Sequence, residues 1–361
     1  TLAVDGDIFL ITDGTGSATV VNDAGLKLGA STVGGDLSAT ATTGNITDTG
    51  ALAITGTTTL VTSADDATIV LNTTTNAFTG AVTITTNDDS GTDADVTIDG
   101  GTTALIIAAS TIDGDLTLTS GHASGITDSG TVTVGGNFTA TTDANSGVIN
   151  MGTMAVDGSF TLAPNSTGAV TIVNDAGLTL AASTMGGTFS GTATTGDITD
   201  SGALAITGAA TFITGATGSN IVLDTSTNAF SNSVEMRADA GNEAFGNITF
   251  VDSAAIDFAT SASSNGDLFI NGSTDGAVGG NLSVTATTGN ITDTVALAVS
   301  GTTTLVTSAD DATITLDTTT NAFTGAVTIT TNDSSGTDAD VTIDGGTTAL
   351  IIAASTIDGD L

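Results

Sequence analysis

Residues 44–60 read GNITDTGALAITGTTTL, and residues 66–85 read DATIVLNTTTNAFTGAVTIT. Both stretches consist of short runs in which apolar and polar side chains alternate or nearly alternate. Thr, Val and Ile fill the runs, and Gly, Asp and Asn separate them, as strand and turn propensities require. Because such alternation is typical of half-buried strands, the sequence predicts short β-strands joined by tight turns.

The same stretches recur along the chain. Residues 36–116 return at 281–361 with eight differences over 81 positions, and residues 21–32 return in looser form at 173–184. The Ile-Thr-Asp motif, whose aspartates are Asp48, Asp128, Asp200 and Asp293, marks a superrepeat of about 80 residues. We therefore expect one continuous β-solenoid array over residues 1–361, with superrepeats at 36–114, 115–187, 188–280 and 281–361.

Two architectures fit about eight short strands per superrepeat: a string of β-sandwich domains, or a β-solenoid. A sandwich repeat normally needs a large aromatic core residue, and the chain has no Trp or Tyr. A solenoid also tolerates the variable spacing of the motif, because one coil can lengthen alone. We therefore predict a solenoid with about 18 coils of about 20 residues, four per superrepeat. Phe78, Phe230 and Phe323 would stack at one interior position.

The two quoted stretches resemble the repeats of giant β-strand-repeat surface proteins of Gram-negative bacteria, of the filamentous-haemagglutinin type. That resemblance implies a right-handed parallel β-helix, export across the outer membrane, and an extracellular or cell-surface location. It further implies a role as an adhesin or as a fibre of a biofilm matrix. The partners would then be further copies of the chain, and cell-surface or matrix glycans.

Charge narrows the partners further. The formal net charge is −37, and Lys27 and Arg237 are the two basic residues. The chain cannot neutralise phosphates, so we expect no binding to nucleic acid, and we expect no membrane insertion either. High charge favours disorder, but a mean hydropathy of +0.34 and ordered alternation oppose it.

Catalysis is not expected. A lyase on this fold needs basic residues close together, whereas Lys27 and Arg237 lie far apart in sequence. A glycoside hydrolase needs two carboxylates at a set separation, and the pairs Asp65–Asp66, Asp88–Asp89 and Asp310–Asp311 sit in repeated turns. His122 has no Cys or second His as a co-ligand. Thr-x-Thr pairs are interpreted as strand chemistry, and ice binding is the less favoured alternative. A polysaccharide-binding or polysaccharide-degrading β-helix remains the alternative to a fibre.

One candidate metal site is repeated. Asp93, Asp95 and Asp99 fall in TDADVTIDGG, and Asp338, Asp340 and Asp344 occupy the same places in the later copy. Oxygen ligands clustered at a turn suit Ca²⁺, although neither the helix–loop–helix spacing nor the nonapeptide calcium repeat is present. We therefore predict a Ca²⁺ site there, with solvated turn aspartates as the alternative.

Two further features concern contacts with partners. Residues 231–280 are the least repetitive stretch and contain Arg237, both glutamates, Phe245, Phe250, Phe258 and Phe269, so they are predicted to form a lateral contact patch. If a second copy followed the last residues, DGDL, its Thr1-Leu2-Ala3 would continue the repeat as Thr117 continues residues 113–116. Thr1–Ala3 also match residues 161–163. Copies are therefore expected to stack head to tail, or to continue in tandem.

Overall fold

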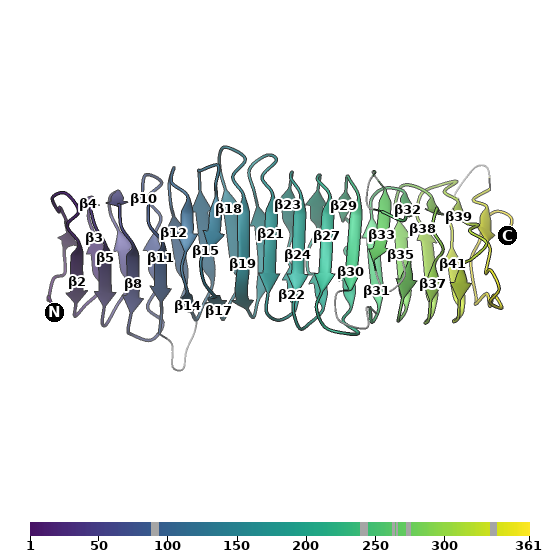
Figure 1. The fold of residues 1–361 in the computed structure, drawn as a ribbon, viewed down its shortest axis with the longest axis horizontal. Coiled ribbons are helices and arrows are strands. Elements are labelled where there is room, and N and C mark those ends of the chain that lie inside the picture. Colours follow the sequence, from purple (N-terminus) through teal and green to yellow (C-terminus); the bar gives the residue numbers. More distant parts are fainter. Residues whose placement is uncertain (88–93, 239–244, 262–263, 265, 272–275, 333–337) are drawn as a thin grey trace. The chain divides into compact units, whose positions relative to one another are not determined.

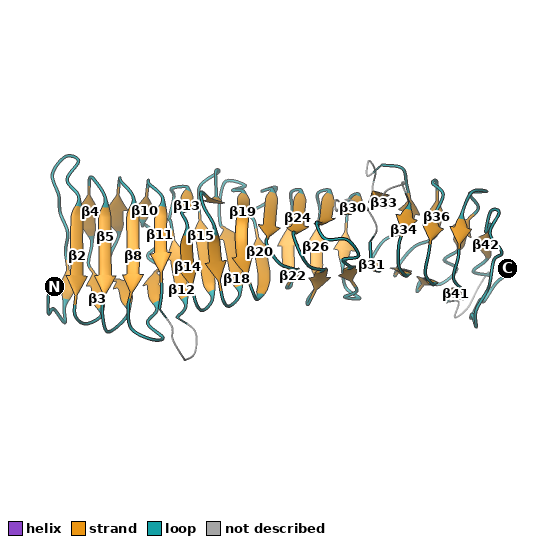
Figure 2. Ribbon diagram, turned by 60° about the horizontal axis from the view of Figure 1, so that its bottom comes forward, coloured by secondary structure: helices purple, strands orange, loops and turns teal. Residues whose placement is uncertain are grey.

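The computed structural model describes residues 1–87, 94–238, 245–261, 264, 266–271, 276–332 and 338–361. Throughout this part of the chain the regular elements are β-strands, and every strand pairing is parallel (Figure 2). The chain forms two compact units, Thr1–Asp175 and Ala176–Leu361. Both are parallel β-solenoids whose turns follow one another at about 22 residues, about 14 turns in all. The predicted all-β solenoid is confirmed, with coils that are longer and fewer than the sequence indicated.

The first unit stacks its coils through three sheets (Figure 1). The first sheet contains β1 (Asp7–Ile8), β3 (Leu26–Leu28), β6 (Ile46–Asp48), β9 (Ile69–Leu71), β12 (Val96–Asp99), β15 (Leu116–Ser120), β18 (Phe138–Thr142) and β20 (Ser159–Ala163). The second sheet contains β2 (Ala18–Asn22), β5 (Leu37–Ala41), β8 (Thr58–Thr62), β11 (Val82–Thr85), β13 (Leu105–Ile107), β14 (Ser110–Ile112), β16 (Ile126–Asp128), β17 (Val132–Val134), β19 (Ile149–Val156) and β21 (Val170–Asn174). A short third sheet joins β4 (Ser31–Val33), β7 (Leu52–Ile54) and β10 (Ala77–Phe78).

The second unit repeats this plan. Its first sheet contains β22 (Leu178–Leu180), β25 (Ile198–Asp200), β28 (Ile221–Leu223), β31 (Ile248–Asp252), β35 (Leu282–Ala286), β38 (Thr303–Thr307) and β41 (Val327–Thr330). Its second sheet contains β24 (Phe189–Ala193), β27 (Ala210–Thr214), β30 (Val234–Ala238), β32 (Ile256–Phe258), β33 (Asp267–Asn271), β36 (Ile291–Asp293), β39 (Ile314–Leu316) and β42 (Val341–Ile343). Two small sheets join β23 (Ser183–Met185), β26 (Leu204–Ile206) and β29 (Ala229–Phe230), and β34 (Ala277–Val278), β37 (Ala298–Val299) and β40 (Ala322–Phe323).

Alternation along each strand builds the core. In the first unit Val96, Leu116, Phe138 and Phe160 pair in turn from coil to coil, and all four are buried. Successive coils therefore stack like on like, at the roughly 4.8 Å spacing of paired strands. Between the buried positions, outward side chains such as Thr117 and Thr139 also pair in register. Equivalent positions in successive coils therefore build one buried column of apolar side chains.

Phenylalanines in the second unit contact one another across its sheets, from β24 and β27 through β29 to β31. The rings of Phe189, Phe212, Phe230 and Phe250 follow one another with centroids 5.3, 6.1 and 5.1 Å apart. These separations lie in the favourable range for aromatic pairs. The buried position predicted for Phe78, Phe230 and Phe323 is confirmed for all three.

The superrepeat does not contain a whole number of coils. From β6 the first sheet takes three coil steps, through β9 and β12 to β15, before the next Ile-Thr-Asp motif follows in β16. That strand lies in the second sheet, whereas β6 lies in the first. The second unit repeats the change from β25 to β36. Each superrepeat therefore advances about three and a half coils, and the prediction of four shorter coils per superrepeat is wrong.

The first residues take a different register from the predicted one. Leu2 bridges to Asn22, as Met154 pairs with Asn174. The N–H of Val4 donates to Asn22 Oδ1 over 3.0 Å, and the N–H of Val156 donates to Asn174 Oδ1 over 2.9 Å. Residues 1–6 therefore correspond to residues 153–158, which read TMAVDG, and the match to residues 161–163 is wrong.

Candidate functional site

The Ile-Thr-Asp motif is a connection between coils. Asp200 Oδ1 accepts the N–H of Asp224 over 2.9 Å, and Oδ2 accepts Asn228 Nδ2 over 2.7 Å. Asn228 is buried, and its Oδ1 accepts the N–H of Leu204 over 2.9 Å. One aspartate and one asparagine thus join the coil that carries the motif to the next coil. We call this arrangement the Asp–Asn clip.

The clip occurs three times in the described residues. Asp48 and Asn76 form it with the N–H of Leu52, at 2.7 Å and 2.8 Å. Asp293 and Asn321 form it with the N–H of Leu297, at 2.7 Å for both bonds. Burial raises the pKa of Asp293 above its ordinary value, and the amide of Asn321 opposes that rise.

The clip is altered at the fourth copy of the motif. The carboxylate of Asp128 accepts the N–H groups of Gly152 and Thr153, at 2.9 Å and 2.6 Å, and also the hydroxyl of Thr153. A backbone N–H bonded to a carboxylate is a charge-assisted hydrogen bond, roughly twice as strong as a neutral one. All four motif aspartates therefore carry out the same task of joining coils.

Short polar side chains form a second connection on the outside. In the second unit the side-chain oxygens of Asp197, Asn220, Asn247 and Asn281 each accept the N–H of the matching residue one coil on, at 2.7–2.9 Å. The N–H of Thr302 donates to Asn281, the last acceptor in this row. The first unit has the same row from Asp95 through Asp115 and Asn137 to Ser159. We call each row an Asx ladder.

The predicted calcium ligands fall among these structural carboxylates. Asp95 and Asp340 each accept an N–H from the next coil, donated by Asp115 and Asp360, over 2.8 Å. Asp99 and Asp344 each accept the N–H two residues on, over 2.7 Å, at turns whose glycines have φ near 60°. Burial raises the pKa of Asp99. Asp338 is exposed.

These contacts do not assemble a metal centre within the described residues. No group of three or more acidic, His or Cys side chains in that part of the chain is placed to share an ion. Asp93, the remaining predicted ligand, lies outside the described residues. The calcium site stays a prediction.

Two of the aspartate pairs considered for hydrolysis, Asp65–Asp66 and Asp310–Asp311, occupy turns. Asp66 and Asp311 have φ of 55° and 58°, in the left-handed region where Asp is tolerated. Asp88 and Asp89 lie outside the described residues. His122 borders a surface hollow of about 270 Å³ with Thr79, Thr102, Thr103 and Ala104, and its Nδ1 accepts the N–H of Ser124. Another hollow, of about 450 Å³, lies beside Lys27 and is bordered by Asp5 and Asn45.

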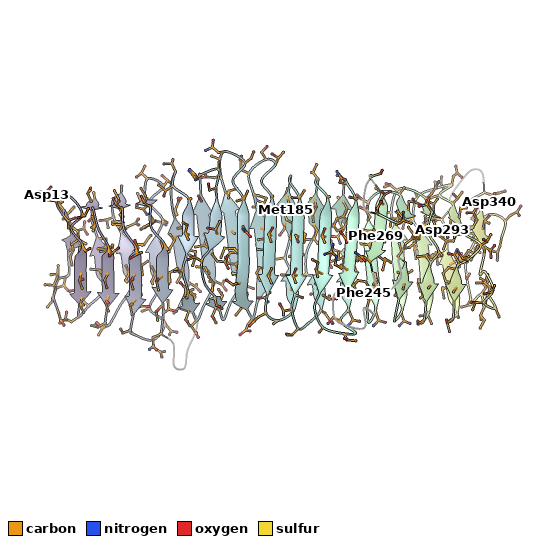
Figure 3. The ribbon with its side chains drawn as sticks, viewed as in Figure 1. Asp13, Met185, Phe245, Phe269, Asp293 and Asp340 are labelled. Atoms are coloured by element: carbon orange, nitrogen blue, oxygen red, sulfur yellow. The ribbon has the colours of Figure 1, made fainter. Side chains whose placement is uncertain are left out.

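Residues 231–280 separate into core and surface. Phe245, Phe250 and Phe258 are buried, so the aromatic part of the predicted contact patch is mostly core, whereas Phe269 is half-buried (Figure 3). Glu243 lies outside the described residues. Glu235 and Arg237 stand on the outward face of β30 and form an ion pair at 3.0 Å. Among the charged and aromatic residues of this stretch that the structure describes, these two side chains and Phe269 are partly exposed.

In the described part of the chain, no helix has the length and apolar character needed to cross a membrane. Neither the curated proteins nor the solved structures contain a significant match to this sequence. A family described as repeats of unknown function (DUF5649) matches at residues 15–85, 93–157, 167–237 and 245–330. These four segments cover most of the sequence and begin at similar intervals, in keeping with the superrepeat. The chain belongs to this family of repeats of unknown function.

Proposed function

We propose that this chain is a non-catalytic structural segment of an extracellular fibre or adhesin stalk. The observation that carries the proposal is the repeated use of side chains to bond one coil to the next. Asp–Asn clips and Asx ladders add to the strand hydrogen bonds at the same coil junctions. A solenoid is stabilised by just such nearest-neighbour contacts, which suit a part that must hold its length under load.

The proposal includes association of the chain with further coils of its own kind. Leu350 and Ile352 are each 37% exposed, whereas Leu105 and Ile107, their counterparts in the earlier copy of the repeat, are fully buried. At the opposite end Leu2, which bridges to the buried Asn22, is 45% exposed. Exposed side chains in core positions favour burial by another coil, because apolar surface is expelled from water.

Register also supports self-stacking. Because Leu2 bridges to Asn22, a second copy that follows Leu361 directly would set Leu361 against Val20 of that copy. In the joined sequence, Leu361 and Val20 of the second copy would be as many residues apart as Val96 and Leu116, which pair in the structure. Stacking of separate copies and tandem continuation of one chain would both produce this contact, and both give an open filament.

Electron microscopy and sedimentation velocity of the purified chain test the proposal. We expect filaments whose mass grows with concentration, and a shift to single chains when Leu350→Asp and Ile352→Asp are combined. The matched control combines Leu105→Asp with Ile107→Asp, which should unfold the protein instead. Single chains at every concentration would refute self-stacking. Immunogold labelling of the native cells tests the location, and label confined to the cell interior would refute an extracellular role.

A further inference from the structure

Five outward side chains gather on neighbouring strands of the second unit. Glu235 and Arg237 come from β30, Phe269 and Asn271 from β33, and Ile213 from β27. Strand pairing sets Glu235 beside Phe269, and Arg237 between Ile213 and Asn271. Their neighbours along each strand, such as Met236 and Ile270, point inward and are buried. We call this group the Arg237 patch.

The polar members of the patch hold one another in place. Glu235 Oε1 accepts Arg237 Nε over 3.2 Å and Arg237 Nη2 over 3.0 Å. The same oxygen accepts Asn271 Nδ2 over 3.0 Å, so three donors converge on it. Side chains already fixed in one geometry lose little entropy on binding, which is the basis of preorganisation. The polar side chains of the patch are therefore linked to one another by hydrogen bonds.

Donors and acceptors remain available at the outer side of this arrangement. The Arg237 side chain is 37% exposed, and a guanidinium carries five N–H donors. Two of its nitrogens contact Glu235, and Nη1 makes no hydrogen bond within the described residues. Glu235 Oε2 and Asn271 Oδ1 are likewise without a partner there. Phe269, half-buried on the next strand, adds an aromatic surface.

We propose that the Arg237 patch binds a neutral saccharide. An anionic ligand is disfavoured by the net charge of −37, and the positive charge of Arg237 is already matched by Glu235. A cationic ligand would have to displace Arg237 from Glu235. A neutral sugar meets neither obstacle, because its hydroxyls both donate and accept, and the C–H face of its ring can cover Phe269. Few placed polar groups beside an aromatic surface are typical of small-ligand sites.

The repeat itself shows that these residues are not needed for the strand. Glu235 and Arg237 correspond to Thr83 and Thr85 of β11 in an earlier repeat, and to Thr328 and Thr330 of β41 in a later one. All three strands have the same alternation of buried and outward positions at these sites. Because threonine stands at both outward positions in the other two strands, neither Glu235 nor Arg237 is required to form the strand.

The reversion variant Glu235→Thr with Arg237→Thr tests the proposal in the full chain. Saturation-transfer NMR would use maltohexaose, cellohexaose, laminarihexaose and chitohexaose as neutral probes, and a hexamer of galacturonic acid as the charged probe. We expect saturation transfer from the protein to at least one neutral probe, weakened about tenfold in the reversion variant and in Phe269→Ala. Circular dichroism and thermal unfolding should be unchanged in the reversion variant, because it restores the residues of the repeat.

Thr328→Ala with Thr330→Ala, at the equivalent positions of β41, is the matched control and should leave binding unaltered. The proposal is overturned if no neutral probe receives saturation, if the reversion variant retains it, or if the galacturonic acid hexamer binds as well as the neutral probes. The outcome is independent of the fibre proposal, since filaments can form with or without this patch.

Discussion

Replacement of Asn228 by alanine should weaken one coil junction strongly. The change removes the acceptor of the buried Leu204 N–H and the donor at 2.7 Å to Asp200. An unsatisfied buried N–H costs about 1–3 kcal/mol, and a lost hydrogen bond to a charged group costs about 1.5–3 kcal/mol. Asp200 keeps its bonds to Asp224 and Thr225, so we expect a loss of about 3–5 kcal/mol.

The matched comparison is Asn220→Ala on the Asx ladder. Asn220 also bonds both neighbouring coils, through Asp197 and Asn247 at 2.8 Å and 2.7 Å, but it is only partly buried. Water can replace its lost partners, so we expect a cost of about 1 kcal/mol. The comparison therefore separates buried from solvated hydrogen bonds between coils.

Amide hydrogen exchange at Leu204 is the assay of choice, because solenoids need not unfold in one step. We expect the Leu204 amide to lose protection in Asn228→Ala and to keep it in Asn220→Ala. Chemical denaturation measures the overall loss in the free energy of unfolding. Equal costs for the two variants, or an unchanged Leu204 amide, would refute the view that the Asp–Asn clip stabilises the junction.

Three further predictions concern polar groups. Thr58→Val should raise the free energy of unfolding by about 1 kcal/mol, because the buried Thr58 hydroxyl makes no hydrogen bond within the described residues. Thr62→Val should lower the free energy of unfolding, because it removes a hydrogen bond to the Ala67 carbonyl. Denaturation curves that show no contrast between the two variants would contradict this prediction. Burial raises the pKa of Asp252 above 3.8, so the folded state holds this proton more tightly and loses stability as pH rises through that raised pKa. Asp252→Asn should therefore gain stability relative to the parent as pH increases from about 4 to 7, measured by thermal unfolding, and a gain that shrinks with pH would show the sign to be wrong. If the predicted calcium site exists, Ca²⁺ should raise the melting temperature more than Na⁺ at equal ionic strength, and equal shifts would leave charge screening as the sole effect.

The sequence predicts the strands and the solenoid because both depend on local alternation, which one coil suffices to display. It does not predict the Asp–Asn clip, because Asp200 and Asn228 are 28 residues apart and meet only when the coil length is known. The half-coil advance is hidden for the same reason. The length of the superrepeat divides as readily into four short coils as into three and a half longer ones, and only strand pairing distinguishes them.

The exposed part of residues 231–280 could have been found from strand parity. Phe250 and Phe258 each lie two residues after a buried isoleucine, Ile248 and Ile256, and therefore point inward with them. Phe269 lies between Leu268 and Ile270 and must point outward. Composition alone treats these phenylalanines alike, whereas their positions within the strand period separate core from surface.

The charge of an aspartate in the Asx ladder is not required for the geometry of the ladder. Asp36 and Asn281 occupy the same position in the two most similar repeats. Each accepts the N–H and the hydroxyl of a threonine on the next coil, at 2.8 Å and 2.9–3.0 Å. Thr57 is the donor in one repeat and Thr302 in the other. A carboxylate and an amide therefore build the same ladder, because both place an oxygen at the same reach from the backbone. Glutamate, one methylene longer, would not. Ladder geometry explains why the short Asx side chains dominate, but it leaves open which of the two stands at each rung. The net charge of −37 is therefore not needed to build the ladder.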